Sequence, residues 1–217
     1  MPVELVLIHG WGFDAHVWDA LGERLADYPQ IKVNLGFFST HKTPVFSEDG
    51  RVLIGHSFGL VHGLTQWHNW RGWIAINSFT RFVTTESRIG CVPAAQLRDM
   101  RARLQKNPSE TLYSFYRMIN ATPHIGIPNV ERLTAALDEL RDADVKDTLE
   151  KFDVPGLVLA GSEDPLVPSA ASEELGQLAK DGGLLVSRGG NHMLPQARPA
   201  WCALAIADFL KTNFGES

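Results

Sequence analysis

The chain has 217 residues, of which 44% are hydrophobic and 21% charged, so it is long and apolar enough to bury one sizeable core. A formal net charge of −5 argues against a nucleic-acid partner, because neutralising phosphates takes a basic surface. The two cysteines, Cys91 and Cys202, make neither a disulfide framework nor a metal-ligand cluster, so we expect a cytoplasmic protein. The first apolar run is too short to cross a bilayer, and we expect no membrane partner.

Apolar runs that predict buried strands alternate with stretches of helical spacing along most of the chain. In chain order, strands are predicted at residues 3–9, 31–35, 51–55, 73–77, 156–160 and 184–187. Helices of the same part are predicted at residues 16–27, 58–67 and 199–210. Because a strand, a helix and a second strand make a parallel crossover, this alternation predicts an α/β fold with a mainly parallel sheet flanked by helices.

The interval 82–151 interrupts the alternation, since it holds no convincing strand but several helical patterns. These cover about 94–105, a stretch that begins at Asn107, and 130–140. Asn107 can cap the second helix, Pro108 fits its first turn and Glu110 can complete a capping box. We therefore expect residues 82–151 to form a helical cap inserted between two core segments, 1–81 and 152–217. The alternative is an extra helical layer packed far from any site.

A serine stands between two glycines where the third predicted strand gives way to a helix. The segment reads GHSFG and matches the pattern G-x-S-x-G, in which the serine is a nucleophile. Gly55 and Gly59 have no Cβ, so the strand and helix can approach closely and hold Ser57 above the carboxyl ends of the strands. Ser57 could instead be a helix N-cap, and its hydroxyl becomes a nucleophile only beside a base.

Two loops farther along the chain supply the partners that such a serine needs. The segment GGNHMLP places His192 after the last predicted strand as general base, and GSEDPLVP places Asp164 after the preceding strand as the residue that orients it. The order Ser57, Asp164, His192 is the nucleophile–acid–histidine order of the G-x-S-x-G enzymes. Glu163 is the rival for the acid, but an aspartate before proline fits the turn better.

The tetrahedral intermediate of acyl transfer also needs donors for its oxyanion. The expected donors are the backbone N–H groups of Phe58 and Trp11, the latter in the glycine-rich loop HGWG after the first strand. The same loop could be only a compact turn.

The other histidines are expected to have structural roles. His9 shapes the first loop, and His56 points away from the serine. The rest lie on a helix (His62 and His68) or in helical or loop contexts (His16, His41 and His124). No pair has the spacing of metal ligands, so we expect a mechanism without metal or cofactor.

Together these motifs resemble the α/β-hydrolase superfamily over nearly the whole chain. The segments LVLIHGWGFDAHVWDAL and GSEDPLVP, with the helical cap, are similar to the pimeloyl-[acyl-carrier protein] methyl ester carboxylesterase family of biotin synthesis. That family cleaves a methyl ester from a carrier-bound dicarboxylate. The resemblance therefore implies a serine carboxylesterase with nucleophile Ser57, acid Asp164, base His192 and oxyanion amides at Trp11 and Phe58.

The family's cap presents arginines to the acidic carrier protein. Here the predicted helix at 94–105 and its end carry a basic cluster, Arg98, Arg101, Arg103 and Lys106. The resemblance implies substrate or carrier contacts at Arg98 and Arg101, while a solvated helix face is the alternative. Phe115 could line an apolar acyl pocket, as could Tyr116 and Met118, or pack in the core.

The chain departs from the family after the second strand. It reads GFFSTHKTPVFSEDG where the family has a proline-glycine loop and a full helix. We expect this shortened crossover to remove some cover from the sheet.

Other functions fit the same triad, because the motif does not read the leaving group. A thioesterase, a general short-chain esterase or a cofactor-free perhydrolase would carry it too. The alternative from another class is a non-catalytic binding module, against which the complete triad speaks. We expect an ester substrate, an acyl-carrier protein as its candidate carrier, and a monomer.

Overall fold

The structure, a computed structural model, describes residues 3–38 and 50–215 of the chain. Within these residues six parallel strands form one sheet, in the spatial order β2-β1-β3-β4-β7-β8. The strands are β1 (Glu4–Ile8), β2 (Gln30–Val33), β3 (Arg51–His56), β4 (Trp70–Ile76), β7 (Gly156–Gly161) and β8 (Asp181–Ser187). The α/β class and the predicted parallel sheet are confirmed.

The central strands are apolar on both faces. Leu5 of β1, Leu53 of β3 and Ile74 of β4 are fully buried, and so is the residue that follows each of them. Parallel strands that helices cover on both sides read as continuous apolar runs, which is why the sequence predicts them well.

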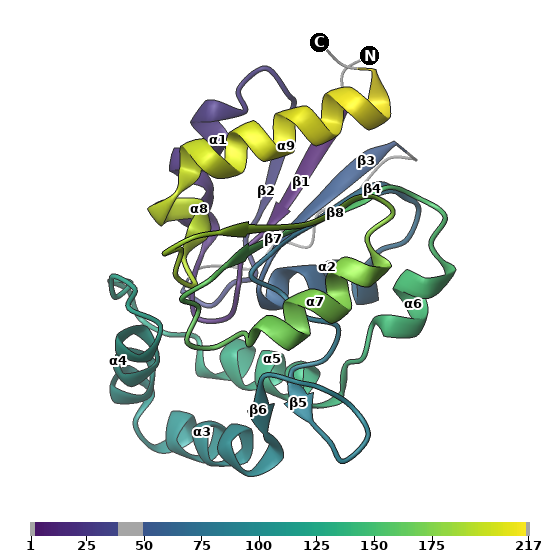
Figure 1. The fold of residues 1–217 in the computed structure, drawn as a ribbon. Coiled ribbons are helices and arrows are strands. Elements are labelled where there is room, and N and C mark those ends of the chain that lie inside the picture. The colour runs from purple at the N-terminus through teal and green to yellow at the C-terminus, as the bar shows by residue number, and fades with distance from the viewer. Residues whose placement is uncertain (1–2, 39–49, 216–217) are drawn as a thin grey trace.

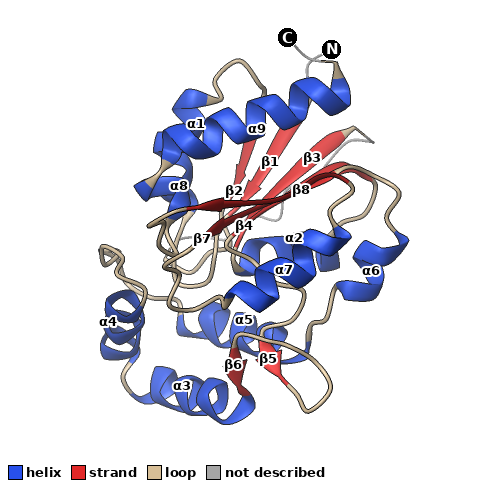
Figure 2. Ribbon diagram, in the orientation of Figure 1, coloured by secondary structure: helices blue, strands red, loops and turns tan. Residues whose placement is uncertain are grey.

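Helices cover both faces of the sheet (Figures 1 and 2). On one face, α1 (Asp19–Arg24) packs against α8 (Leu194–Ala197) and α9 (Pro199–Phe214). On the other face, α2 (Phe58–Gln66) contacts β1 and β3, and α7 (Ser169–Leu178) contacts β7 and β8. The helix α7 was not predicted from the sequence.

The predicted helix at 16–27 is wrong in its extent. The structure has a short 3-10 helix, η1 (Ala15–Trp18), followed by α1, which ends at Arg24. The Gln30 amide donates to the carbonyls of Gly22 and Leu25, at 2.9 and 2.8 Å. A side chain of β2 thus provides these carbonyls at the end of α1 with the donors that a further helical turn would otherwise supply.

Between β4 and β7 the chain leaves the sheet and forms four helices among the described residues. They are α3 (Ala94–Lys106), α4 (Pro108–Met118), α5 (Val130–Asp142) and α6 (Lys146–Lys151). The expectation that this interval holds no strand is wrong, because β5 (Val83–Thr84) pairs with β6 (Val92–Pro93). Strands of two residues are too short to show a periodicity. Residues 82–151 remain our proposed cap.

Asn107 occupies the N-cap position of α4, but its side chain makes no capping hydrogen bond with any described residue. Its carbonyl oxygen instead accepts from the backbone N–H and the hydroxyl of Thr111, at 3.0 and 2.9 Å. The predicted capping box is therefore wrong, although the helix begins where the sequence places it.

The two segments that connect the proposed cap to the sheet contact each other. Arg81 and Asp144 form an antiparallel bridge, and the Val145 N–H donates to the carbonyl of Thr80 at 2.9 Å. Arg88 forms an ion pair with Asp144 at 2.9 Å. Main-chain and side-chain contacts thus join the two connecting segments at the base of the proposed cap.

The shortened crossover expected after β2 falls largely on residues 39–49, which lie outside the described residues, as does His41.

Candidate active site

Ser57 lies at the sharp turn between β3 and α2. Its backbone has φ 52° and ψ −122°, a region that residues with a Cβ rarely adopt. A Cβ on Gly59 would lie 2.0 Å from the Ile8 carbonyl oxygen, and one on Gly55 would lie 2.3 Å from the Leu60 nitrogen. Glycine is therefore required at both positions, because a Cβ would clash with the neighbouring backbone. Ser57 occupies the N-cap position of α2, but its side chain makes no capping hydrogen bond with any described residue.

Backbone contacts fix this strained turn in place. The Ser57 N–H donates to the carbonyl of Ile76 at 3.0 Å, and the Ser78 hydroxyl donates to the Ser57 carbonyl at 2.7 Å. Both partners belong to β4 or the residues just after it. The end of β4 and the residues after it therefore bind both the N–H and the carbonyl of Ser57.

His192 and Asp164 form a buried pair. The His192 Nδ1 lies 2.7 Å from Asp164 Oδ2, and the two side chains are 1% and 2% exposed. The other carboxylate oxygen accepts from the N–H groups of Leu166 and Val167, at 2.8 and 3.0 Å. Burial opposes ionisation, but the His192 ring and these donors outweigh it and lower the pKa of Asp164. Glu163, the rival for the acid, is exposed.

The loop that carries His192 is tied to the ends of β3, β4 and β7. The His192 carbonyl accepts from His56 Nε2 at 2.9 Å and from the Asn77 amide at 2.7 Å. Asn77 also donates to the Asn191 carbonyl at 2.8 Å and accepts from the Gly161 N–H at 2.8 Å. A single buried side chain thus joins the ends of β4 and β7 to the histidine loop.

Asn77 was missed by the sequence analysis as a functional residue. It stands just after β4 with a φ of 45°, and only the polar residue at the end of an apolar strand hinted at a role. Its partners lie far away along the chain.

The structure brings His192 close to the turn that carries Ser57. The His192 and His56 rings have centroids 5.0 Å apart, and His56 directly precedes Ser57. Among the described residues no hydrogen bond joins the Ser57 hydroxyl to the His192 ring. Such bonds are often long until substrate is bound.

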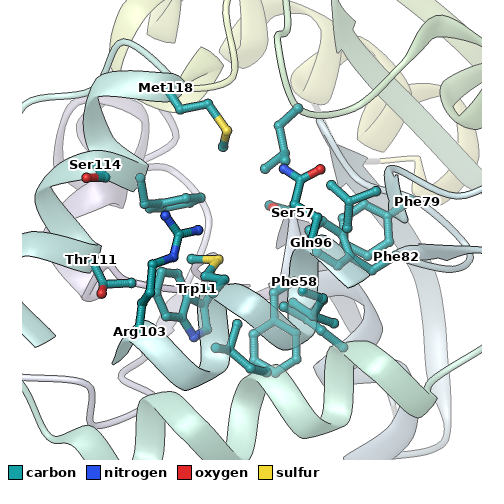
Figure 3. Close-up of a pocket in the computed structure, with 17 residues that line it drawn as sticks. Trp11, Ser57, Phe58, Phe79, Phe82, Gln96, Arg103, Thr111, Ser114 and Met118 are labelled. Carbon is teal, nitrogen blue, oxygen red and sulfur yellow. The ribbon is translucent and has the colours of Figure 1, made fainter. Parts of the chain in front are cut away.

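Ser57 opens into a cavity of about 210 Å³ between the sheet and the residues of the proposed cap (Figure 3). From the core it is lined by Trp11, Ser57, Phe58, Phe79 and Leu166. From residues 82–151 it is lined by Phe82, Val92, Gln96, Leu97, Met100, Arg103, Thr111, Ser114, Phe115, Met118, Leu137 and Leu140. The walls are mainly apolar, as an acyl-binding pocket requires.

The two residues whose backbone amides are expected to bind an oxyanion, Trp11 and Phe58, line this cavity. The backbone N–H groups of Trp11 and Phe58 make no hydrogen bond with any described residue. The Trp11 indole donates to the Leu133 carbonyl at 2.9 Å, and its ring meets the Phe115 ring edge-on, with centroids 5.0 Å apart. The core loop after β1 is thus anchored to the proposed cap.

The predicted cap contacts separate into two groups. Phe115 lines the Ser57 cavity, as does Met118, whereas Tyr116 does not and donates instead to the Gly12 carbonyl at 2.5 Å. Arg98 and Arg101 line a different cavity, beside α5. Arg101 is held there by two bonds to Asp138, at 2.8 and 3.0 Å.

Two other histidines are buried in the core. His9 Nε2 accepts from the Leu35 N–H at 3.0 Å, and burial lowers the pKa of His9 to about 4. Burial, followed by the neighbouring His192, lowers the pKa of His56 to about 3. Both rings are therefore neutral near pH 7 and serve as fixed hydrogen-bonding groups.

The remaining described histidines lie nearer the surface. His62 on α2 pairs with Glu139 at 3.0 Å. His68 lies beyond the end of α2, so its predicted place on the helix is wrong. His16 and His124 approach Asp14, at 3.1 and 3.6 Å. In the part of the chain that the structure describes, no group of three or more histidine, cysteine and acidic side chains could hold a metal ion.

Among the described helices, none combines the length and apolar character needed to span a bilayer.

Comparisons with known proteins agree with the fold. No protein-family model matches the chain. A pimeloyl-[acyl-carrier protein] methyl ester esterase of Sodalis glossinidius is 26% identical over 242 residues, which cover 95% of this chain and 93% of that protein. A bromoperoxidase of Bacillus anthracis superposes with a TM-score of 0.83 at 16% identity, over 97% of this chain and 92% of the other. An esterase of Exiguobacterium antarcticum gives 0.81, also at 16% identity, over 96% and 92%. The chain thus has the α/β-hydrolase fold, and its sequence is similar to the pimeloyl-[acyl-carrier protein] methyl ester esterases.

Proposed function

We propose that the protein is a serine esterase in which Ser57, His192 and Asp164 form the catalytic triad. The observation that carries the proposal is the buried 2.7 Å contact between His192 and Asp164, beside a strained serine that opens into an apolar cavity. Histidine and aspartate in this arrangement are what a serine hydroxyl needs to become a nucleophile.

In the proposed mechanism the Ser57 oxygen attacks the ester carbonyl while His192 Nε2 accepts its proton. Asp164 holds the Nδ1 proton, fixes the tautomer and stabilises the imidazolium. The Trp11 and Phe58 N–H groups stabilise the oxyanion, and the loss of one such donor typically costs about 3 kcal/mol. His192 then protonates the departing alcohol. A water molecule, which His192 deprotonates, releases the acid and restores the serine.

The proposed substrate is the methyl ester of a pimeloyl group on acyl-carrier protein, as the names of the relatives state for those proteins. The mainly apolar lining of the cavity supports an acyl chain beside Ser57. The cytoplasmic location expected from Cys91 and Cys202 is part of the same proposal, and both thiols are free. Thioesters and other short esters are the competing substrates.

Turnover of p-nitrophenyl butyrate by the wild type and by Ser57→Ala, His192→Ala and Asp164→Asn tests the triad. We expect each variant to lose at least about a thousandfold in kcat, because triad members act as a unit. Ser169→Ala, at the exposed start of α7, is the matched control and should keep full activity. A fluorophosphonate should label the wild type and the control but not Ser57→Ala. Equal turnover by the wild type and Ser57→Ala would refute the proposal.

Carrier-protein recognition is tested separately with methyl pimeloyl-carrier protein and the free methyl ester, at low and moderate salt. Charge reversal of Arg98, which lies on α3 outside the Ser57 cavity, should slow only the carrier-bound substrate. Because exposed charges are screened by salt, the effect should shrink as salt rises. Unchanged turnover of the carrier-bound substrate would leave α3 as a solvated face.

A further inference from the structure

The Ser57 cavity contains one charged side chain among the described residues that line it. This is Arg103 on α3, and its neighbours in the wall are mainly apolar or aromatic. Figure 3 shows the Arg103 guanidinium pointing into the cavity, with Ser57 on the opposite wall. A charge in such a wall is unexpected if the pocket takes only a plain acyl chain.

Arg103 has no acidic partner in the described part of the chain. Its one hydrogen bond there is a long contact of 3.4 Å from Nε to the Asp99 carbonyl. By contrast, Arg101 on the same helix is neutralised by Asp138, and Arg141 by Asp138 and Asp142. The terminal N–H groups of Arg103 therefore remain available to a ligand.

A guanidinium presents a planar fork of donors that matches a carboxylate with two parallel hydrogen bonds. Arg103 is an exposed residue, so solvent and salt weaken this attraction, and the pairing depends on the fork of donors as well as on the charge. At about 210 Å³ the cavity encloses only a short acyl group, since pockets for drug-sized ligands span roughly 300–1,000 Å³. A charged group on such an acyl chain would come to lie near Arg103.

We propose that Arg103 binds a carboxylate at the far end of the acyl group, so that the enzyme prefers monoesters of dicarboxylic acids to uncharged esters of equal length. The inference rests on the proposed function, with Ser57 as nucleophile. In such a carrier-free monoester Ser57 cleaves the ester end while Arg103 holds the acid end. In the proposed carrier-bound substrate the far carboxyl is a thioester, so cleavage of these monoesters is a further activity of the same site. Arg103 is thus a specificity-determining residue of the site.

The test compares monomethyl esters of dicarboxylic acids of four to nine carbons with methyl esters of monocarboxylic acids of equal carbon number. The readout is the ratio of kcat/KM between the two series, in the wild type, Arg103→Met and Arg103→Lys. Arg117→Met is the matched control, because Arg117 is an exposed arginine on α4 that does not line the cavity.

Because Arg103 is exposed, Arg103→Met should lower this ratio by roughly fivefold, mainly through KM. Arg103→Lys should restore part of the preference, because it keeps the charge but not the fork. Arg117→Met should keep the wild-type ratio. The ratio should also fall with rising salt.

A wild type without a preference, or an Arg103→Met variant that slows both series equally, would overturn the inference. So would a dependence on Arg103 that appears with methyl pimeloyl-phosphopantetheine but with neither the pantetheine ester nor the monoesters, since the anion would then be a phosphate.

Titration calorimetry with adipate and pimelate separates this failure from failure of the proposed function. We expect both dicarboxylates to bind the wild type more tightly than Arg103→Met, whether or not esters are cleaved. Equal binding by the two proteins would refute the carboxylate site. Ester turnover that is independent of Ser57 would instead refute the proposed nucleophile.

Discussion

Replacing Asn77 with alanine removes the three hydrogen bonds that join β4 to β7 and to the histidine loop. The Asn77 amide donates to the carbonyls of Asn191 and His192, at 2.8 and 2.7 Å, and accepts from the Gly161 N–H at 2.8 Å. Each such bond contributes about 1 kcal/mol net, and a buried group left unpaired costs about 1–3 kcal/mol. We therefore expect the free energy of unfolding to fall by about 3 kcal/mol or more.

The same substitution should lower kcat more than it changes KM for a p-nitrophenyl ester. The His192 carbonyl would keep the His56 donor but lose the Asn77 donor, so the imidazole would be held less firmly beside Asp164. Urea unfolding and steady-state kinetics measure the two effects.

Two further variants separate the loss of these hydrogen bonds from backbone strain and from the loss of an unrelated hydrogen bond. Asn77→Gly removes the hydrogen bonds but tolerates the positive φ of 45°, so its effects report on the bonds without the backbone strain that alanine adds. Asn213→Ala, which removes one bond of 2.9 Å to the Phe209 carbonyl within α9, is the control and should leave kcat unchanged. The reasoning fails if Asn77→Gly unfolds at the wild-type urea concentration, or if it keeps the wild-type kcat.

Three other predictions follow from the structure. Gly59→Ala would place a Cβ 2.0 Å from the Ile8 carbonyl oxygen, so we expect no folded protein or a large loss of stability in urea, and a wild-type transition would contradict the close approach. The pKa values of His9 and His56, about 4 and about 3, lie below the ordinary value of 6.5, so the unfolded chain takes up protons first as the pH falls. Stability should therefore decline from pH 6.5 to about 4, by up to about 1.4 kcal/mol per pH unit for each ring, and a flat unfolding free energy over this range would refute the burial of neutral rings. Phe115→Ala should enlarge the Ser57 cavity and shift the preference among p-nitrophenyl esters toward longer chains, at a cost of about 3–5 kcal/mol in stability; an unchanged chain-length profile would remove Phe115 from the acyl wall.

The sequence predicted the central sheet well, because strands buried on both faces read as unbroken apolar runs. It also predicted the loops of Ser57, Asp164 and His192, since parallel strands bring their carboxyl ends to one edge. The bond between Asp164 and His192 agrees with that expectation, and their catalytic role remains our proposal.

Other features depend on contacts between distant residues and leave little trace in the sequence. Asn77 is one polar residue at the end of a strand, and its role comes from partners more than 80 positions away. Arg101 and Arg103 stand two residues apart on α3, yet one is neutralised by α5 and the other faces the cavity. The different environments of the two arginines arise from the packing of α3 against α5, which brings Asp138 to Arg101. The helix α7 was missed because its buried side chains are small or few: Ala171, Ser172 and Leu175.

The main-chain bridge between Arg81 and Asp144 has a consequence for engineering and for evolution. Paired residues in antiparallel strands have Cα atoms about 5 Å apart, so the ends of the intervening segment could be spliced by a short turn without disturbing the sheet. The intervening residues also hold the loop after β1, through the bonds from Trp11 to Leu133 and from Tyr116 to Gly12. We therefore expect a graft from another enzyme at these two positions to alter substrate choice, and to keep activity only if it supports this loop in the same way.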